Sequence, residues 1–433
     1  MGTVPSVRAF GRRIVDTGVM SNTRNSRAVQ SVDLAASPSS SRSSRRRLLV
    51  WRVLAVPVVA AIALGAAGGA ASAVPSKGEA ESLKSRAQGL VEAGYPAALA
   101  AVSDSKGESA GVAVGKGNLE TGQAPPMDGE VRVGSNTKTF VAVVVMQMVQ
   151  EGKVGLDEPI ETYLPGLIRG EGIDGSKITV RQLLQHTSGL PDFDETLFGT
   201  TDVFQYRYHY VTPRDVLDSA LSKQAQFEPG TQWKYTNTNY IVLGMLVERV
   251  SQRPVGEQID QRIVKKLGLS HTYFPAPGEE KIRGTHPRGY HLNGEGKLED
   301  ITEMDPTWGW AAGAMVSTPS ELNTFFQAVF DGRLLTQASI QEMKKGVDIG
   351  SGGRVYGLGI VGTPLSCGGT AWGHGGDIAG YHTRGGVGPD GTAVTVAVTA
   401  LPTAVTDQSN LENSAKEKAG KIAEAVDISL CHK

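Results

Sequence analysis

Residues 131–149 read V-R-V-G-S-N-T-K-T-F-V-A-V-V-V-M-Q-M-V, an S-x-x-K motif between a short apolar segment and a long apolar run. The run predicts a buried helix from Thr139 to Val149, with Ser135 at its N-terminus. Because an α-helix repeats every 3.6 residues, Lys138 should lie one turn after Ser135 on the same face. The stretch therefore predicts a serine and a lysine side by side at the start of a central helix.

This pair has a chemical use. A serine hydroxyl is a poor nucleophile until a base takes its proton. Burial disfavours the charged form of a lysine, so a buried Lys138 can act as that base near neutral pH. The helix N-terminus adds free N–H groups for a developing oxyanion. The spacing alone is weak, since it recurs at Ser103–Lys106 within an expected hairpin turn.

The chain on either side of this helix predicts an α+β fold. Helical patterns cover 79–93 and 411–426, and alternating apolar patterns predict strands at 97–102, 111–114 and 392–399. The middle of the chain is mostly helical, with a capping box at Thr179–Gln182 and a C-terminal glycine at Gly152. We expect an antiparallel sheet flanked by the terminal helices, carrying a mostly helical insertion at about 136–300.

Composition excludes some classes of function. The 433 residues are 40% hydrophobic and 20% charged, which predicts a folded body with a sizeable core. Residues 1–52 carry a net charge of +8 and the rest carries −9, so the basic excess is confined to one end. This distribution excludes a nucleic-acid binder built on a basic body.

The basic end precedes an export pattern. Arg45–Arg47 come before an apolar run over 53–71 and the triplet A-S-A at 71–73, which predicts a signal peptide cleaved after Ala73. The motif S-R-R-R-L-L at 44–49 is similar to a twin-arginine signal. The alternative is an uncleaved membrane anchor. We expect a disordered basic region and signal over 1–73, one folded domain over 74–433, and a secreted protein.

Export permits disulfides, and the chain has two cysteines, Cys367 and Cys431. Two cysteines are the minimum for one bridge, and the alternative is a pair of free buried thiols. The sequence G-E-S-A-G at 107–111 matches a nucleophile elbow, and G-L-G-I-V-G at 357–362 matches a dinucleotide fingerprint. Neither is expected to open a helix: the first is assigned to a hairpin turn that continues into a strand, and Pro364 follows the second too closely. No metal-ligand motif is present, and no metal or cofactor is implied.

Two further motifs accompany the S-x-x-K motif. Tyr235 and Asn237 form a Y-x-N motif just before an expected helix, and His374-Gly375-Gly376 forms an H-x-G motif before a strand. Taken singly, Tyr235 and His374 are more often structural residues. The order S-x-x-K, Y-x-N and H-x-G along one exported chain is much more specific.

With these motifs the chain resembles the serine β-lactamase and penicillin-binding superfamily, in its class C β-lactamase and DD-peptidase branch. The resemblance spans the whole chain after the signal and includes Y-L-P-G-L (163–167), Q-H-T-S-G-L (185–190), Y-T-N-T-N-Y (235–240), A-G-A-M-V-S-T (312–318), Y-G-L-G (356–359) and L-S-C-G (365–368). The cysteine positions match as well. The resemblance implies an antiparallel sheet, a helical region, and an active site in the groove between them.

The resemblance also implies roles for individual residues. Ser135 corresponds to the acylated nucleophile, Lys138 to its base, and Tyr235 to the proton shuttle to the leaving group. Asn237 corresponds to the amide that holds substrate, and His374 to the third-motif residue on the strand lining the groove. The remaining substrate-binding positions implied are the groove-wall aromatics Phe198 and Trp308, with Gly376 and Asp377 on the third-motif strand.

Three departures concern the substrate. Where the DD-peptidase pattern has two hydroxyl residues and an arginine that binds the substrate carboxylate, this chain has Gly375, Asp377 and Val361. Without the arginine, and with the added Asp377 charge, we expect an amidated peptide to be cleaved at least as well as the free acid. Arg384, in the same hairpin, is an alternative source of the missing cation.

The function expected is that of an exported serine hydrolase acting through an acyl-enzyme on peptide-like amides, similar to a D-alanyl-D-alanine carboxypeptidase. Alternatives with the same machinery are an esterase, a D-aminopeptidase-like enzyme or a class C-like β-lactamase. A catalytically silent penicillin-binding sensor is a further alternative. The partners expected are small peptide or peptidoglycan-stem-like substrates, with β-lactams as inhibitors or substrates. No nucleic acid is expected, and a membrane only if the signal stays uncleaved.

Overall fold

The structure is a computed structural model and describes residues 77–193, residue 197 and residues 202–431. The basic N-terminal region, the apolar run and the cleavage triplet lie outside these residues, so export stays a prediction. None of the helices in the described ranges combines the length and the apolar character needed to cross a membrane.

A nine-stranded antiparallel sheet forms the frame of the fold. The N-terminal hairpin pairs directly with a C-terminal strand, so early and late parts of the described chain lie side by side next to the β2 edge of the sheet. In spatial order the strands are β2 (Ser109–Gly115), β1 (Ala97–Ser103), β15 (Ala393–Val398), β14 (Tyr381–Val387), β12 (Thr370–Gly373), β11 (Val361–Pro364), β10 (Val355–Tyr356) and β9 (Val347–Asp348), with β13 (Gly375–Ile378) paired to β14.

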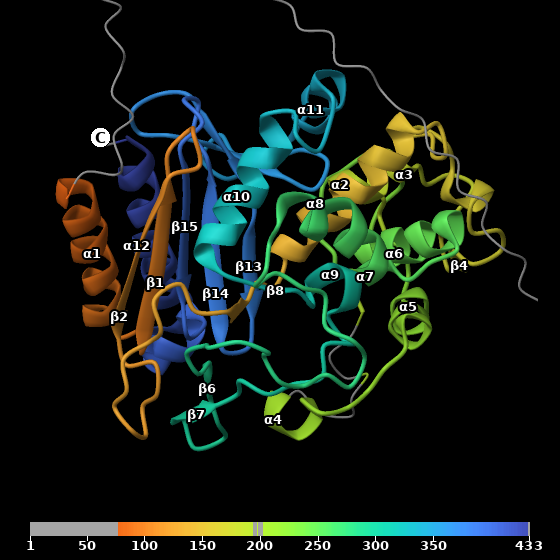
Figure 1. Ribbon diagram of the computed structural model, residues 1–433. Helices are drawn as coiled ribbons and strands as arrows, with labels where there is room; N and C mark the ends of the chain where they lie inside the picture. The colour runs from red at the N-terminus through yellow and green to blue at the C-terminus, as the bar shows by residue number, and fades with distance from the viewer. Residues whose placement is uncertain (1–76, 194–196, 198–201, 432–433) are drawn as a thin grey trace, which may run out of the picture. The chain divides into compact units, whose positions relative to one another are not determined.

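Helices cover both faces of this sheet. Helices α1 (Lys77–Glu92) and α12 (Leu411–Cys431) pack on one face, and α10 (Pro319–Phe330) packs on the other (Figure 1). Alternate residues of β1 serve the two sides, because Leu99 joins the core beneath α10 whereas Ala98 and Ala100 join the core beneath α1 and α12. The predicted sheet with flanking terminal helices is confirmed.

The helical region surrounds helix α2 (Asn136–Gln150), which begins directly after Ser135 as predicted. Thirteen of its fifteen residues are buried, because α6, α7 and α9 pack around it. A helix that is apolar on all sides is stable only at the centre of a protein. The remaining helices here are α3 (Val180–Gln185), α4 (Val203–Tyr206), α5 (Pro213–Leu221), α6 (Thr238–Ser251), α7 (Val255–Ile259), α8 (Lys265–Leu267) and α9 (Trp310–Gly313), and α11 (Gln337–Met343) follows α10.

Shorter elements complete the chain. A π-helical turn spans Asp260–Val264, and 3-10 turns span Ile160–Thr162, Pro402–Val405 and Gln408–Asn410. Three two-stranded sheets pair β3 (Val131–Arg132) with β8 (Val316–Ser317), β4 (Arg169–Gly170) with β5 (Ile173–Asp174), and β6 (Tyr290–Leu292) with β7 (Leu298–Asp300). Strand β3 matters most for function, since it leads directly into Ser135.

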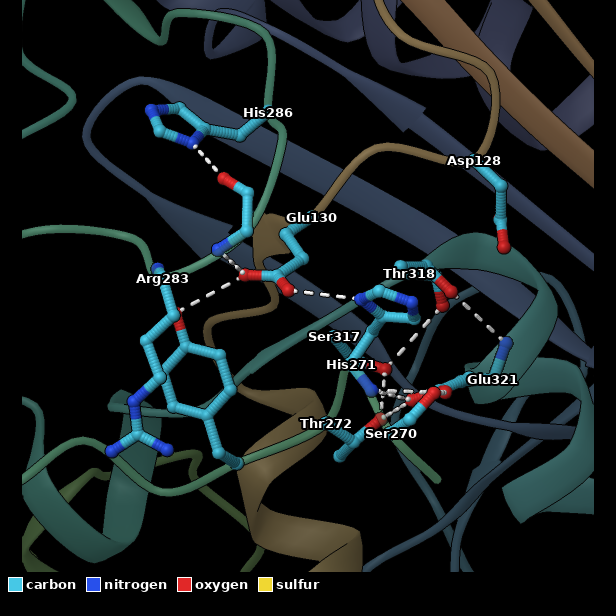
Figure 2. A network of polar contacts seen from close by, with 12 residues as sticks. Asp128, Glu130, Ser270, His271, Thr272, Arg283, His286, Ser317, Thr318 and Glu321 are labelled. Carbon is cyan, nitrogen blue, oxygen red and sulfur yellow. Dashed lines mark hydrogen bonds and ion pairs between the residues drawn. The ribbon is translucent and has the colours of Figure 1, made fainter. Parts of the chain in front are cut away.

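A buried polar network anchors the start of β3 (Figure 2). The carboxylate of Glu130 is almost fully buried and accepts hydrogen bonds from the Gly284 N–H at 2.9 Å and the Tyr273 hydroxyl at 3.3 Å. Its other oxygen lies 3.1 Å from Nδ1 of His271, whose own backbone N–H donates to Glu321 in the first turn of α10. The network thus ties the strand before the nucleophile to the segment after α8 and to the sheet-covering helix.

Arg132, two residues after Glu130, fixes the same strand. The Arg132 guanidinium is buried without an acidic partner and donates instead to the carbonyl oxygens of Thr302, Glu280 and Met304, at 2.6 to 3.2 Å. Three carbonyl acceptors satisfy the buried donors and hold a long loop against β3. The backbone that delivers Ser135 is therefore held on both sides.

Several local predictions are confirmed. The segment over 104–108 is the tight turn between β1 and β2, and residues 357–362 run from β10 into β11 without opening a helix. Thr179 and Gln182 form the predicted capping box of α3. Gly152 follows the last turn of α2 with φ +68°, the left-handed conformation typical of a glycine that ends a helix.

Candidate active site

Ser135 and Lys138 lie together at the start of α2. Nζ of Lys138 is 2.9 Å from Oγ of Ser135, 2.8 Å from Oδ1 of Asn237 and 2.8 Å from the carbonyl oxygen of Ala312. Ser135 occupies the N-cap position, yet its side chain makes no capping hydrogen bond and its backbone is already helical. A serine at an N-cap ordinarily uses its hydroxyl to cap. Here that hydroxyl is left to face the lysine.

The surroundings of Lys138 favour a neutral amine. Burial lowers its pKa from 10.5 to about 7, against the opposing charges of Asp192 and Asp377. Two of its three partners are carbonyl oxygens, which can only accept hydrogen bonds. A neutral amine has two N–H groups for those oxygens, so its lone pair is directed at the Ser135 hydroxyl. The contacts therefore orient Lys138 as a proton acceptor.

Tyr235 is brought to the same point from the loop before α6. Its side chain is half-buried, and Nζ of Lys138 lies 4.9 Å from the ring centroid. Burial holds its pKa well above the usual range, although a hydrogen bond with the Ser135 side chain opposes that rise. A tyrosine in this environment keeps its proton at neutral pH and can donate it.

Asn237 is held in place by an aspartate that the sequence analysis missed. Asp192 accepts hydrogen bonds from the Asn237 backbone N–H at 3.0 Å and from its Nδ2 at 3.2 Å. Oδ1 of Asn237 faces Lys138, so the amide orientation is fixed from both ends. Asp192 lies two residues after the Q-H-T-S-G-L motif, but nothing local in the sequence predicts that it meets Asn237, 45 residues later.

Strand β13, which follows His374 of the H-x-G motif, lies on the other side of the active site and packs against the segment before Ser135. A Cβ on Gly376 would lie 1.8 Å from the carbonyl oxygen of Val133, so only glycine lets β13 pack against the segment before the nucleophile. A Cβ on Gly134 would lie 2.9 Å from the backbone nitrogen of Asp377. Two glycines facing each other across this contact bring the start of α2 against the strand.

His374 ends a chain of hydrogen bonds through two further residues that the sequence analysis missed. Nδ1 of His374 lies 2.6 Å from the carbonyl oxygen of Gly375, and Nε2 lies 2.9 Å from the Tyr356 hydroxyl. That hydroxyl is also 3.1 Å from Nε2 of His186, whose Nδ1 receives the backbone N–H of Thr236 at 3.3 Å. The chain joins the H-x-G strand to the Y-x-N motif.

The ends of this chain assign both tautomers. The Thr236 N–H can only donate, so Nδ1 of His186 accepts and its Nε2–H donates to Tyr356. The Gly375 carbonyl can only accept, so Nδ1 of His374 carries hydrogen and its Nε2 accepts from Tyr356. Burial lowers the pKa of His374 to about 3 and that of His186 well below its usual range. Both histidines are therefore neutral links rather than acids or bases.

A cavity of about 430 Å³ opens at the nucleophile. Both sides of the groove contribute to its lining, which consists of Ser135, Trp233, Tyr235, Asn237, Ile349, Arg354, Tyr356, Val361, His374, Gly375, Asp377 and Arg384. Within the described ranges, no group of three or more His, Cys, Asp or Glu side chains is arranged to hold a metal ion.

The comparison with known proteins explains this arrangement. The family model for Beta-lactamase matches residues 83–419. The chain belongs to the Beta-lactamase family. Among curated relatives it is 29% identical over 213 residues to the putative penicillin-binding protein PbpX of Bacillus subtilis, and 27% identical over 245 residues to penicillin-binding protein 4* of the same organism. These matches cover 49% and 53% of this chain, and the chain spans only about half the length of either relative, 49% and 51%.

Solved structures of this family match over a greater length. A D-stereospecific amidohydrolase from Streptomyces sp. is 33% identical, with a TM-score of 0.71, over 80% of this chain and 98% of that one. The D-amino acid amidase from Ochrobactrum anthropi SV3, complexed with L-phenylalanine amide, is 26% identical with a TM-score of 0.69, over 81% and 99%. This protein is therefore similar both to penicillin-binding proteins and to amidases for D-amino acid derivatives.

The expectation about the charge of Asp377 is wrong. Asp377 was expected to repel a substrate carboxylate, but its two oxygens accept from Nη1 and Nη2 of Arg384 at 3.0 and 3.1 Å. Oδ1 also lies 2.5 Å from Nδ1 of His382, the residue directly opposite on β14. Burial raises the pKa of Asp377, but the His382 contact and the Arg384 charge hold it well below its usual range. The carboxylate is ionised and paired.

The two predicted wall aromatics have different outcomes. Phe198 lies outside the described residues. Trp308 is not among the residues lining the described part of the cavity, and its ring packs edge-on against Tyr206, 6.3 Å away between centroids. Trp233, two residues before Tyr235, lines the cavity instead, and no sequence motif indicated it.

The two cysteines are joined. Cys367, between β11 and β12, forms a disulfide with Cys431 at the end of α12, which confirms the predicted pairing. The bridge ties the C-terminal helix to the turn that joins these two strands of the sheet.

Proposed function

We propose that this protein is an exported serine hydrolase that cleaves peptide-like amides of D-configured acyl groups through an acyl-enzyme on Ser135. The observation that carries the proposal is the Lys138 amine, buried and directed at Ser135 by two carbonyl acceptors. The relatives named as D-stereospecific amidohydrolase and D-amino acid amidase support the amide and the D configuration. The penicillin-binding relatives support β-lactams as inhibitors or substrates.

In the first step, neutral Lys138 takes the Ser135 proton as Oγ bonds to the carbonyl carbon. The carbonyl π electrons move to oxygen and form a tetrahedral oxyanion. We propose the backbone N–H groups of Ser135 and Asp377 as its donors, because Asp377 packs against Gly134, the residue before the nucleophile.

In the second step, the carbon–nitrogen bond breaks and the leaving amine needs a proton. Tyr235 retains its proton and hydrogen-bonds with Ser135, so it is the donor suited to this task. The proton that Lys138 received then replaces the one Tyr235 gave. Water attacks the ester in the reverse sense, with Lys138 as base, and returns Ser135 and the acid product.

The test combines labelling with turnover. Purified protein beginning at Val74 is incubated with a fluorescent penicillin or a fluorophosphonate, and the adduct is located by peptide mass spectrometry. We expect it on Ser135 and absent in Ser135→Ala. Ser109→Ala, at the start of β2 in the G-E-S-A-G sequence, is the matched control and should still be labelled.

Turnover is measured on D- and L-phenylalanine amide, a D-Ala-D-Ala peptide, nitrocefin and a short-chain ester. We expect the D-amide to exceed the L-amide in kcat/KM, and all activity to disappear in Ser135→Ala. An adduct on another residue, or L-amide preference, contradicts the proposal. Labelling without turnover of any substrate favours a silent penicillin-binding sensor. Export is tested separately, by N-terminal sequencing of protein recovered from the culture medium, where Val74 is the expected first residue.

A further inference from the structure

One edge of the large sheet is long and unpaired. Strand β2 pairs with β1 alone, and it lies at one end of the strand order (Figure 1). The strand at the other end, β9, has only two residues. By contrast, β2 has seven residues, S-A-G-V-A-V-G, and contains neither a charge nor a proline. An edge strand of this length without such residues is open to pairing with another strand.

The hydrogen bonds of the hairpin show which backbone groups of β2 face outward. The N–H of Asp104 donates to the carbonyl oxygen of Glu108 at one end of the hairpin. At the other end, the N–H of Lys116 donates to the carbonyl oxygen of Pro96. Bonded and non-bonded positions alternate along an antiparallel pair, so every second residue from Glu108 to Lys116, including Val112, bonds inward to β1. The residues between them direct their N–H and C=O groups outward: Ser109, Gly111, Ala113 and Gly115.

These outward groups are available for pairing. Within the described ranges, no backbone hydrogen bond joins the outer side of β2 to another segment. Helix α1 packs on the face of the sheet that carries Val112 and Val114, which leaves the edge itself open. Ser109 and Gly111 are exposed. The edge therefore presents four N–H groups and four carbonyl oxygens at alternate positions.

The strand is complementary to a second copy of itself. When two β2 strands pair antiparallel over their full length, Val112 lies opposite Val112 of the second copy, on a twofold axis. Ser109 then lies opposite Gly115, and Gly111 opposite Ala113, so outward positions meet only outward positions. Each such pair exchanges two hydrogen bonds, and all the outward groups are used. A shift of one residue would set outward positions against inward ones, and a larger shift would leave groups unpaired.

The charges that flank the strand fit the same register. Glu108 and Lys116 lie four residues before and after Val112, so each Glu108 would lie opposite Lys116 of the second copy. Both side chains are exposed, and neither has an ion-pair partner among the residues that the structure describes. Opposite charges directly across an antiparallel pair are favourable, and like charges are unfavourable. Met127, a large apolar side chain that is 65% exposed, lies beside Gly111 and adds apolar surface next to the edge.

We propose that two copies of this protein associate through β2 and join their nine-stranded sheets into one continuous antiparallel sheet. The twofold axis passes through the Val112 pair, and a Glu108–Lys116 ion pair lies on each side of it. Strands β1, β15 and β14 separate β2 from β13, so the association leaves both grooves at Ser135 open. The inference is independent of the proposed hydrolase activity.

The first experiment measures self-association. Protein beginning at Val74, which retains every described element, is examined by sedimentation velocity at low ionic strength between about 1 and 100 µM. We expect the average mass to rise with concentration from that of a monomer toward that of a dimer. Glu108→Lys and Lys116→Glu each set like charges opposite one another at both ends of the junction. Either change should therefore raise the dissociation constant about tenfold or more.

Mixing the two variants tests the register directly. In a mixed pair, the two lysines of Glu108→Lys lie opposite the two glutamates of Lys116→Glu, so an equimolar mixture should associate as wild type does. The double variant Glu108→Lys/Lys116→Glu should also associate as wild type. Lys177→Glu makes the same charge change at an exposed lysine outside the hairpin, and it should have no effect. Labelling of Ser135 by a fluorescent penicillin should be equal in all variants, which separates association from folding and from the hydrolase proposal.

Cross-linking gives a second readout. The chain's own cysteines are bridged, so Val112→Cys introduces a single thiol. Its counterpart would lie in a non-bonded pair with Cα atoms about 4.5 Å apart, and mild oxidation should give a disulfide-linked dimer. Ala110→Cys is the matched control, because its counterpart would lie about 13 Å away along the strand. A monomer at all concentrations, dimers that withstand both charge reversals, a mixture that stays monomeric, or equal cross-linking at positions 110 and 112 overturns the inference.

Discussion

The site geometry predicts that kcat/KM depends on pH and that the pKa of Lys138 sets this dependence. The amine is a base only when neutral, and burial lowers its pKa from 10.5 to about 7. Below that pH the lysine carries a proton, so its lone pair is lost and acylation slows. The sign is therefore fixed: kcat/KM for a neutral substrate rises with pH through about 7 and then levels off.

The magnitude follows from the fraction of neutral amine. For a pKa of about 7 this fraction is about one tenth at pH 6 and about nine tenths at pH 8, so kcat/KM should rise about tenfold between them. The assay is steady-state hydrolysis of D-phenylalanine amide in constant-ionic-strength buffers, with labelling by a fluorescent penicillin as a second measure of acylation.

Variants at position 138 separate this lysine from other titrating groups. Lys138→Arg keeps a permanent charge and should be inactive at every pH, and Lys138→Ala should lose several orders of magnitude in acylation. Since the chain's two cysteines are bridged, Lys138→Cys can be alkylated in denaturant with bromoethylamine and refolded. The product carries an amine with a lower pKa than that of lysine. If activity is restored, its kcat/KM should therefore rise with pH at a lower pH than that of the wild-type protein. A profile without a limb near 7, or Lys138→Ala within about tenfold of wild type, refutes Lys138 as the base.

Four further outcomes follow from individual contacts. Asp192→Asn removes a charge that raises the pKa of the lysine base, so the limb of kcat/KM should move to lower pH; a limb that stays or moves up contradicts this. Tyr356→Phe leaves a buried nitrogen on each neighbouring histidine without its partner, and chemical denaturation should show about 1–3 kcal/mol less stability, whereas an unchanged midpoint would exclude the linkage. Gly376→Ala forces a Cβ into a backbone carbonyl and should abolish labelling by penicillin, and a labelled variant would show that the strand can shift. The Cys367–Cys431 disulfide closes a loop of 64 positions, so its reduction should lower the free energy of unfolding by about 4 kcal/mol and the melting temperature with it. An unchanged melting temperature would argue against a stabilising role for the disulfide.

The parts of the site that could be predicted are those carried by local spacing. Ser135 and Lys138 are one helical turn apart, so the period of the helix is enough to bring them together. The Y-x-N and H-x-G motifs could be assigned because their order matches a family. The chain of hydrogen bonds through His186 and Tyr356 could not be predicted, since it joins residues 170 positions apart, where the end of α3 meets the segment between β10 and β11.

The error about Asp377 has a different origin. The hairpin of β13 and β14 turns at Ala379 and Gly380, a two-residue connection that sets Gly375 opposite Arg384 and Asp377 opposite His382. That register was available in the sequence, and it would have indicated a paired carboxylate. From the sequence, Arg384 is a cation available to a substrate, whereas in the structure that arginine pairs with Asp377.

The charges of the groove divide between its centre and its rim. At the centre, the side chains around Ser135 are neutral or can become so near pH 7: Lys138 by burial, His374 and His186 by burial and by their fixed tautomers, and Tyr235 by retaining its proton. The charge of Asp192, which holds Asn237 in place, raises the pKa of Lys138 against the effect of burial, so burial and this carboxylate together set the pH at which the lysine becomes a base. At the rim of the groove, Asp377 pairs with Arg384, so these two charges compensate each other. The pH limb of acylation is therefore expected to respond more to the loss of the Asp192 charge than to the loss of Asp377, whose charge is already paired.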